Sequence, residues 1–285
     1  RAIHVADILD RAALDARLDR VFDERNATVV WLGGEPIDRV AMVDSLLAIG
    51  ERLRPYVKEA EAMVRQAVAE GEDVLFEGAQ GALLDVQHGT YPYVTSSSTN
   101  AGAVATGVGI APSAIDGVVG IVKAYTTRVG EGPFPSELEG PVADHLRSVG
   151  HEFGSTTGRP RRCGWLDLPA LRYAHGLNGF TSLALTKLDV LTGLDEIKLC
   201  VGYRIDGRVV PVPPAASDLD AVEPVYEVFP GWSEDICGVQ SLDGLPDSAR
   251  RYVETIERLV GVTVSLLGTG PGRREIIKRA GLWTS

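Results

Sequence analysis

The first 70 residues carry their apolar side chains at the spacing of amphipathic helices. This period predicts one helix over Asp7–Arg25 and a long helical stretch over Asp38–Glu70. Pro55 lacks a backbone N–H and should kink or split that stretch, and Gly71 stands where a helix often ends. The pattern therefore predicts a mainly helical subregion over residues 1–71.

After residue 71 the pattern changes to short apolar runs separated by helical periods. Strands are expected at Val74–Phe76, Gly117–Tyr125, Phe180–Leu185, Lys198–Arg204, Arg208–Val212 and Val262–Leu267. Helices are expected at Leu168–Leu177, capped by Asp167, and at Ser248–Val260. Alternating strands and helices predict an α/β fold, with a mostly parallel central sheet flanked by helices in residues 72–285.

Composition narrows the class of protein. The 285 residues carry 28 Lys and Arg against 39 Asp and Glu, and this net charge of −11 argues against a general nucleic-acid binder. Three widely spaced cysteines do not suggest a disulfide framework or a zinc site. No apolar run approaches the ~18 residues of a membrane span, and no signal peptide is visible. We expect a reduced, cytoplasmic protein without nucleic-acid or membrane partners.

The clearest candidate site is Thr186-Lys187-Leu188-Asp189, which follows an apolar run. A carboxylate there can accept two parallel hydrogen bonds from the ring N–H and exocyclic amine of guanine, a donor pair that adenine lacks. The Lys stem can lie along the purine face. Gly268-Thr269-Gly270, after another apolar run, could close the other side of the base. The alternatives are a surface ion pair and an ordinary glycine turn.

A second candidate is the basic loop Gly154–Arg162, which holds hydroxyls and three guanidinium groups between glycines. Arginine forks match carboxylate and phosphate groups bidentately, so the loop is a candidate clamp for a dianionic small molecule. The alternative is a solvated basic turn.

A third candidate joins Glu77–Gly81 to the hydroxyl-rich run Tyr91–Thr99. Gln80 can donate and accept hydrogen bonds at once, which suits a heterocycle edge or a phosphate. Helix caps and turns are the alternative role of the hydroxyl run. The sequence contains no Gly-x-x-x-x-Gly-Lys-Ser/Thr phosphate loop. A guanine pocket without a triphosphate cradle is incomplete, so we expect the chain, which begins with Arg1, to be a fragment.

Taken in order, these motifs resemble the adenylosuccinate synthetase family. The matching segments are Phe76–Gly81, His88–Ser97, Lys123–Gly130, Gly132–Pro135, Thr156–Arg159, Arg161–Asp167, Thr186–Leu191 and Pro230–Trp232. The resemblance covers essentially the whole chain, as the C-terminal two thirds or so of the family. It implies a single synthetase domain over residues 1–285 with a fold similar to P-loop NTPases, the N-terminal part of the sheet being absent.

The resemblance also implies the reaction. IMP, L-aspartate and GTP would give adenylosuccinate, GDP and phosphate, with Mg²⁺, through a 6-phosphoryl-IMP intermediate. This is the first committed step from IMP to AMP, and the family works in the cytoplasm as a homodimer.

Site residues follow from the resemblance, motif by motif. The residues implied for IMP are Gln80 near its 6-position, Thr95 at the phosphate, and Arg159. Those implied for aspartate are Val129, through its backbone, and the loop residues Ser155, Thr156, Thr157, Gly158, Arg159, Pro160 and Arg161. Those implied for GTP are Arg161, Lys187, Leu188, Asp189, Gly268, Thr269 and Gly270.

Three departures from the family limit these expectations. The family's phosphate loop is absent, and with it the general-base Asp that also binds Mg²⁺ and the general-acid His. No metal ligand is therefore expected in this chain. The arginine that the family gives to its dimer partner would lie at or before Arg1, and Gly268 replaces a common Ser. We expect the chain alone to be inactive. The alternatives are a non-catalytic guanine-nucleotide-binding module and an ATP-dependent ligase of another class.

Overall fold

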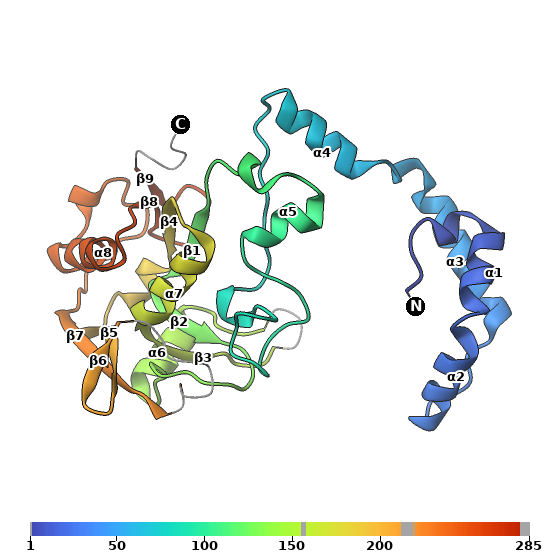
Figure 1. Cartoon of the computed structure of the whole chain (residues 1–285). Coiled ribbons are helices and arrows are strands. Elements are labelled where there is room, and N and C mark those ends of the chain that lie inside the picture. Colours follow the sequence, from blue (N-terminus) through green and yellow to red (C-terminus); the bar gives the residue numbers. More distant parts are fainter. Residues whose placement is uncertain (1, 155–157, 212–218, 220, 280–285) are drawn as a thin grey trace. The chain divides into compact units, whose positions relative to one another are not determined.

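A computed structural model of the chain describes residues 2–154, 158–211, 219 and 221–279 (Figure 1). The chain divides into two compact units, Arg1–Met63 and Val64–Ser285. The expected grouping of residues 1–71 and 72–285 within one synthetase domain stays a prediction.

The first unit is helical. Its elements are the 3-10 turn η1 (Asp7–Leu9), α1 (Arg11–Leu18), α2 (Phe22–Trp31), α3 (Arg39–Leu53) and η2 (Arg54–Tyr56), and α4 (Ala60–Ala69) follows. Asp10 caps α1 and Asp38 caps α3 by accepting backbone N–H groups of the first turn. Ile8, Leu14, Leu18 and Val43 form the core.

Two sequence expectations meet different outcomes here. Pro55 does split the second stretch, because α3 ends at Leu53 and α4 begins only at Ala60. The single helix expected over Asp7–Arg25 is wrong, since it is divided between α1 and α2. Leu18 and Val21 are both buried at that break, so packing of the turn overrides the continuous helical period.

The second unit is α/β, and its described residues form two sheets. The first sheet has the strand order β1 (Val119–Lys123), β4 (Ser182–Thr186), β8 (Val264–Gly268) and β9 (Ile276–Lys278). The second has the order β2 (Tyr125–Arg128), β3 (Arg162–Asp167), β5 (Glu196–Ile205) and β6 (Arg208–Val210), with β7 (Glu223–Pro230) also paired to β5. The remaining helical elements are η3 (Ala82–Leu84), α5 (Gly102–Val108), η4 (Pro112–Ala114), α6 (Pro141–Val149), α7 (Leu168–Asn178), η5 (Leu188–Leu191), η7 (Leu242–Gly244) and α8 (Asp247–Val260).

The sheets are mixed, whereas the sequence pattern predicted a mostly parallel sheet. β1, β4 and β8 run parallel, and so do β3 and β5, but β2, β6, β7 and β9 each pair antiparallel with a neighbour. Short connections account for much of this, because the two-residue turn Asp206-Gly207 can join only antiparallel strands. The α/β class itself is confirmed.

Helices position the second unit's core. α7 begins at Leu168 as predicted, with the Asp167 side chain accepting from the Ala170 N–H at 3.0 Å, and it packs against β5 and α8 (Figure 1). α8 buries Tyr252, Val253 and Ile256 on one face. These side chains join one large apolar core with residues of β3, β4, β5 and β8.

The strand expected at Val74–Phe76 is wrong. Residues 72–79 form neither strand nor helix, and Leu75 is 76% exposed. A strand requires a neighbour for its backbone N–H and C=O groups, and no described strand pairs with this segment. β1 lies at the edge of its sheet, and its central Ile121 is 79% exposed.

Candidate active site

The two segments predicted for guanine meet at neighbouring strand ends. Lys187 directly follows β4, and Gly268 is the last residue of β8, its parallel neighbour. A Cβ atom added to Gly268 would lie 3.4 Å from the Thr186 Cα and 3.8 Å from the Lys187 N. The carboxyl ends of parallel strands are where ligands bind in open α/β sheets. The structure therefore brings Lys187 and Gly268 together.

Lys187 adopts an unusual backbone conformation, with φ of +65°. Such conformations are costly outside glycine and cluster at functional sites. The Lys187 Nζ donates to the Gly150 carbonyl at 2.9 Å, which fixes the direction of the lysine stem. Gln80, another predicted site residue, also has a left-handed φ, of +64°.

Asp189 lies half-buried in η5, beside the fully buried Leu188. Burial raises the pKa of the Asp189 carboxyl; Lys187 opposes this shift, and Glu275 and Asp235 add to it. Within the described residues, no other residue donates a hydrogen bond to this carboxylate. Its oxygens are therefore available to a donor pair on a ligand.

The loop after β8 is firmly held. Thr269 is fully buried, its N–H donates to the Glu275 carbonyl at 2.9 Å, and its Oγ1 donates to the Val239 carbonyl at 3.3 Å. Gly270 lies against the Glu275 carboxylate and the Cys237 sulfur. Cys237 is exposed, whereas Cys163 and Cys200 are buried.

The basic loop is anchored at its base by Glu152, which is only 1% exposed. The Glu152 Oε1 accepts from Lys123 Nζ at 2.7 Å and from the Tyr125 hydroxyl at 2.6 Å. Its Oε2 accepts from the Arg161 guanidinium at 2.7 Å, and its carbonyl accepts from the Arg161 N–H at 2.9 Å. These cations hold the pKa of the Glu152 carboxyl below its ordinary value although burial opposes them.

The rest of the basic loop is only partly described. Gly158 has a left-handed φ of +64°, Arg159 and Pro160 are exposed, and Pro160 forms a bridge with Phe153. Ser155, Thr156 and Thr157 lie outside the described residues. Val129, which directly follows β2, is 61% exposed.

The third candidate region is organised by Asp85, which is fully buried. Its carboxylate accepts from the backbone N–H groups of Gln87, His88 and Thr99 at 2.9, 3.0 and 2.7 Å, and from the Asn100 amide at 2.9 Å. These four hydrogen bonds hold the pKa of the Asp85 carboxyl far below its ordinary value.

The same region brings Gln80 and Thr95 into one loop cluster. The Thr95 N–H donates to the Leu84 carbonyl at 2.8 Å, and the Thr99 hydroxyl donates to the carbonyl of Gly81 at 2.8 Å. The Arg128 guanidinium ties this cluster to β2 by donating to the Thr90 hydroxyl at 2.8 Å. Within the described ranges, no hydrogen bond or ion pair joins Gln80 itself to the other predicted residues.

Sequence reasoning did not single out Glu152 or Asp85. Glu152 sits in a polar stretch after α6, where an acidic residue reads as solvated. Asp85 follows a leucine pair and resembles a turn residue. The sequence signal is absent because each carboxylate also has partners distant along the chain, Lys123 and Tyr125 for Glu152 and Thr99 and Asn100 for Asp85.

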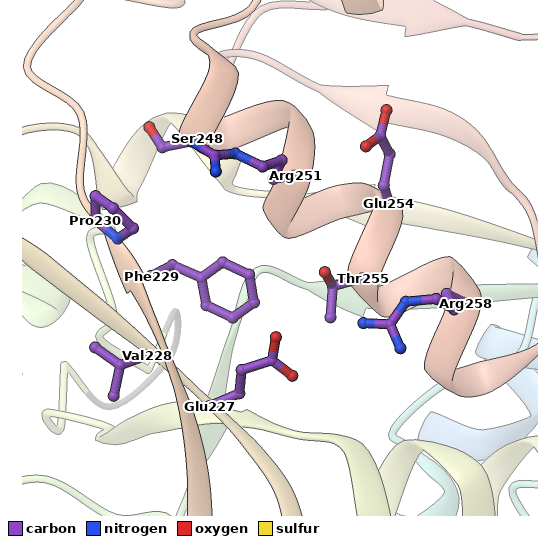
Figure 2. A pocket seen from close by; sticks show the side chains of 9 residues that line it. All are labelled: Glu227, Val228, Phe229, Pro230, Ser248, Arg251, Glu254, Thr255 and Arg258. Atoms are coloured by element: carbon purple, nitrogen blue, oxygen red, sulfur yellow. The ribbon is translucent and has the colours of Figure 1, made fainter.

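A distinct hollow lies elsewhere, between β7 and α8 (Figure 2). It measures about 430 Å³, and Glu227 and Arg258 extend into it from opposite sides. Its full lining is Glu227, Val228, Phe229, Pro230, Ser248, Arg251, Glu254, Thr255 and Arg258. None of these is a predicted site residue. We favour the strand ends over this hollow, because its charged lining is exposed and mixes both signs.

The described part of the chain contains neither a membrane-spanning helix nor a cluster of metal-binding side chains. No helix there is both long enough and apolar enough to span a bilayer. Among residues 2–154, 158–211, 219 and 221–279, no three His, Cys, Asp or Glu side chains come together to hold a metal ion. Mg²⁺ requires oxygen ligands in a strict geometry. The described residues thus provide no cluster of protein side chains that could bind Mg²⁺ by themselves.

Comparison with known proteins decides the family. The sequence profile described as adenylosuccinate synthetase matches residues 1–277. The chain belongs to the adenylosuccinate synthetase family. An adenylosuccinate synthetase of Halothermothrix orenii is 50% identical over 281 residues, covering 98% of this chain and 66% of the relative. One of Thermomicrobium roseum is 49% identical over 283 residues, with the same coverage.

A solved structure agrees with this assignment. The fully ligated adenylosuccinate synthetase from Plasmodium falciparum is similar with a TM-score of 0.91 and 37% identity, over 97% of this chain and 66% of that one. The synthetase fold is thus confirmed for the chain. This chain spans about two thirds of the length of the synthetases it matches.

Proposed function

We propose that this chain contributes to the GTP-dependent ligation of L-aspartate to IMP, the first committed step from IMP to AMP. The observation that carries the proposal is the synthetase match over residues 1–277, together with the meeting of Lys187–Asp189 and Gly268–Gly270 at neighbouring strand ends. The γ-phosphoryl group of GTP moves to the 6-oxygen of IMP. The aspartate amine then forms the C–N bond at C6, and phosphate leaves, giving adenylosuccinate and GDP.

The guanine base lies between the two strand ends in this proposal. Asp189 accepts hydrogen bonds from the ring N–H and the exocyclic amine, and its lack of other donor residues in the described chain supports this role. The Lys187 stem, held by Gly150, lies along the purine face. Leu188 and the backbone of Gly268-Thr269-Gly270 complete the pocket.

The anionic substrates lie over the other two candidate regions. IMP contacts Gln80, Thr95 and Arg159, and aspartate contacts Val129, Ser155, Thr156, Thr157, Gly158, Arg159, Pro160 and Arg161. Arg161 also reaches GTP, where the Glu152 carboxylate fixes one end of its guanidinium fork. Arginine is suited to this work because its planar fork matches carboxylate and phosphate groups.

We further propose that the chain alone is inactive. Phosphoryl transfer requires a cradle for the phosphates and groups that move protons, and this sequence contains no phosphate-loop motif. The proposal includes a cytoplasmic homodimer, and Mg²⁺ with its protein ligands outside this chain.

Adenylosuccinate formation, followed by ultraviolet absorbance with IMP, GTP, aspartate and Mg²⁺, tests the ligase. Two proteins are compared: this 285-residue chain, and the same chain joined to the third of the Halothermothrix orenii synthetase that the match leaves out. We expect turnover from the joined protein alone. Turnover by the 285-residue chain would contradict its inactivity, and a folded joined protein without turnover would contradict the ligase.

A second candidate is a non-catalytic guanine-nucleotide-binding module. One observation favours it: all six residues predicted around the base lie in described segments that meet at the ends of β4 and β8. The module binds GDP with an affinity that IMP and aspartate do not change. The ligase predicts that IMP and aspartate strengthen guanine-nucleotide binding to the joined protein, and calorimetry separates the two.

A further inference from the structure

Glu275 holds the loop that connects β8 to β9. Its carboxylate Oε2 accepts from the Gly272 N–H, and its backbone N–H donates to the Gly272 carbonyl at 3.0 Å. Its own carbonyl accepts from the Thr269 N–H at 2.9 Å. One residue thus fixes both ends of the loop that carries Thr269 and Gly270.

Two glycines of this loop leave room for the carboxylate. A Cβ atom at Gly270 would lie 2.5 Å from the Glu275 Oε2, and one at Gly272 would lie 2.7 Å from it. Neither glycine has a positive φ, so backbone conformation does not demand glycine at these positions. The close approach of the Glu275 carboxylate does.

The neighbouring segment contacts the same loop. The Cys237 sulfur would lie 3.0 Å from a Cβ atom at Gly270, and the Gln240 amide donates to the Arg274 carbonyl at 3.0 Å. The position of the loop relative to the rest of the unit is therefore set around Glu275.

We infer that Glu275 is a positioning residue for purine recognition: its carboxylate keeps Gly268–Gly270 at the distance from Asp189 that admits guanine. This inference rests on the proposed guanine pocket. Gly268 lies beside Lys187, so a loop released by Glu275 moves one wall of that pocket. Guanine uses both walls, whereas adenine lacks the donor pair for Asp189. Displacing the loop therefore costs guanine binding more than adenine binding.

Substitutions can separate a positioning role of Glu275 from an effect of its charge alone. Glu275 and Asp235 both raise the pKa of Asp189, so either could act through charge. Glu275→Asp keeps the charge and shortens the reach by one methylene, whereas Glu275→Gln keeps the reach and an acceptor oxygen. Asp235→Asn removes the other charge, and its carboxylate accepts from the Cys237 N–H rather than from the loop.

The experiment measures GDP and ADP binding to the full 285-residue chain by calorimetry. We expect Glu275→Asp to weaken GDP binding about tenfold, the value of one charge-assisted hydrogen bond, and to leave ADP binding unchanged. We expect Glu275→Gln to lose less than Glu275→Asp, and Asp235→Asn to keep the wild-type ratio. Gly272→Ala, whose Cβ displaces the carboxylate, reproduces the loss without altering Glu275.

Three results would overturn the inference. In the first, Glu275→Asp and Gly272→Ala keep the wild-type ratio of GDP to ADP affinity; in the second, both variants weaken GDP and ADP binding equally. In the third, Glu275→Gln and Asp235→Asn lose the preference for GDP over ADP while Glu275→Asp keeps it. If the wild-type chain binds GDP no better than ADP, the proposed guanine pocket is contradicted, and with it the positioning role of Glu275. The wild-type measurement thus distinguishes the failure of the pocket from the failure of this residue.

Discussion

Asp189 combines an open pair of carboxylate oxygens with a half-buried position at a strand end. The sequence motif alone predicted its role, because a carboxylate two residues after Lys187 at the end of an apolar run suits a guanine base. The motif could not predict that Glu275 and Asp235 also raise the pKa of Asp189, because both residues come from segments more than 40 residues away along the chain.

The raised pKa of Asp189 predicts how GDP binding depends on pH. Guanine needs the ionised carboxylate, so protonation removes the acceptors. Because burial raises the pKa of Asp189, GDP affinity should begin to fall on acidification above the range of an ordinary Asp, whose pKa is about 3.9. Asp189→Asn should lose about 1–3 kcal/mol of the preference for GDP over ADP. The residual GDP affinity of this variant should not show the same fall on acidification in calorimetric titrations across pH. A fall identical to that of the wild-type chain would contradict the assignment of Asp189 to the guanine base.

Asp85, whose pKa is shifted in the opposite direction to that of Asp189, predicts a change in stability. Asp85→Asn turns an amide toward donor groups, and it should lower the free energy of unfolding by about 2–3 kcal/mol at neutral pH. The pKa of Asp85 is lowered on folding, so its contribution is present above the unfolded-state pKa of about 3.9 and is lost as pH falls further. Urea unfolding at neutral and acidic pH checks this, with the exposed Asp116→Asn as control. Equal stabilities at neutral pH would contradict it.

At the scale of elements, helices followed the sequence pattern more closely than strands did. α7, α8 and the break at Pro55 were predicted from period, caps and proline. β7 was missed because Pro224 and Pro230 argue against a strand, yet β7 lies at a sheet edge, where proline is tolerated. Val74–Phe76 was assigned wrongly, because a strand is defined by a partner that the local sequence does not reveal.

The base of the basic loop depends on a carboxylate that local sequence did not indicate. Glu152→Gln leaves Lys123 and Arg161 without their counter-charge. We expect a loss of about 2–3 kcal/mol in the free energy of unfolding. This is below the ~3–5 kcal/mol of a fully buried pair, because the two cations remain 27% and 30% exposed.

Glu137→Gln is the matched control for this prediction. Glu137 pairs with Arg162 next to the same loop, but both side chains are 32% exposed, so its removal should cost under about 1 kcal/mol. Thermal or urea unfolding compares the two variants. If Glu137→Gln lowers the free energy of unfolding as much as Glu152→Gln does, the Glu152 network stabilises the chain no more than an exposed ion pair.

At the scale of the whole molecule, the candidate site draws on loops that lie far apart in the sequence. Local motifs gave the residues that we propose to touch ligands, since each motif can be recognised within one short segment. The buried Glu152 and Asp85 and the partly buried Glu275, which hold those loops, were not found. Glu152 and Asp85 have partners 14 or more residues away that only folding brings near, and the role of Glu275 depends on where the ends of β4 and β8 meet. The proposed guanine site therefore requires that the ends of β4 and β8 form one pocket.

Cys237 offers the most direct measurement of that pocket. It is the exposed cysteine among the three, and its sulfur would lie 3.0 Å from a Cβ at Gly270. Alkylation of Cys237 in the 285-residue chain is followed by mass spectrometry at mildly alkaline pH, because partial desolvation and the nearby Glu275 and Asp235 carboxylates raise the pKa of its thiol. We predict that GDP slows the alkylation, that ADP does not, and that Asp189→Asn removes the protection. An alkylation rate unchanged by saturating GDP would contradict the pocket.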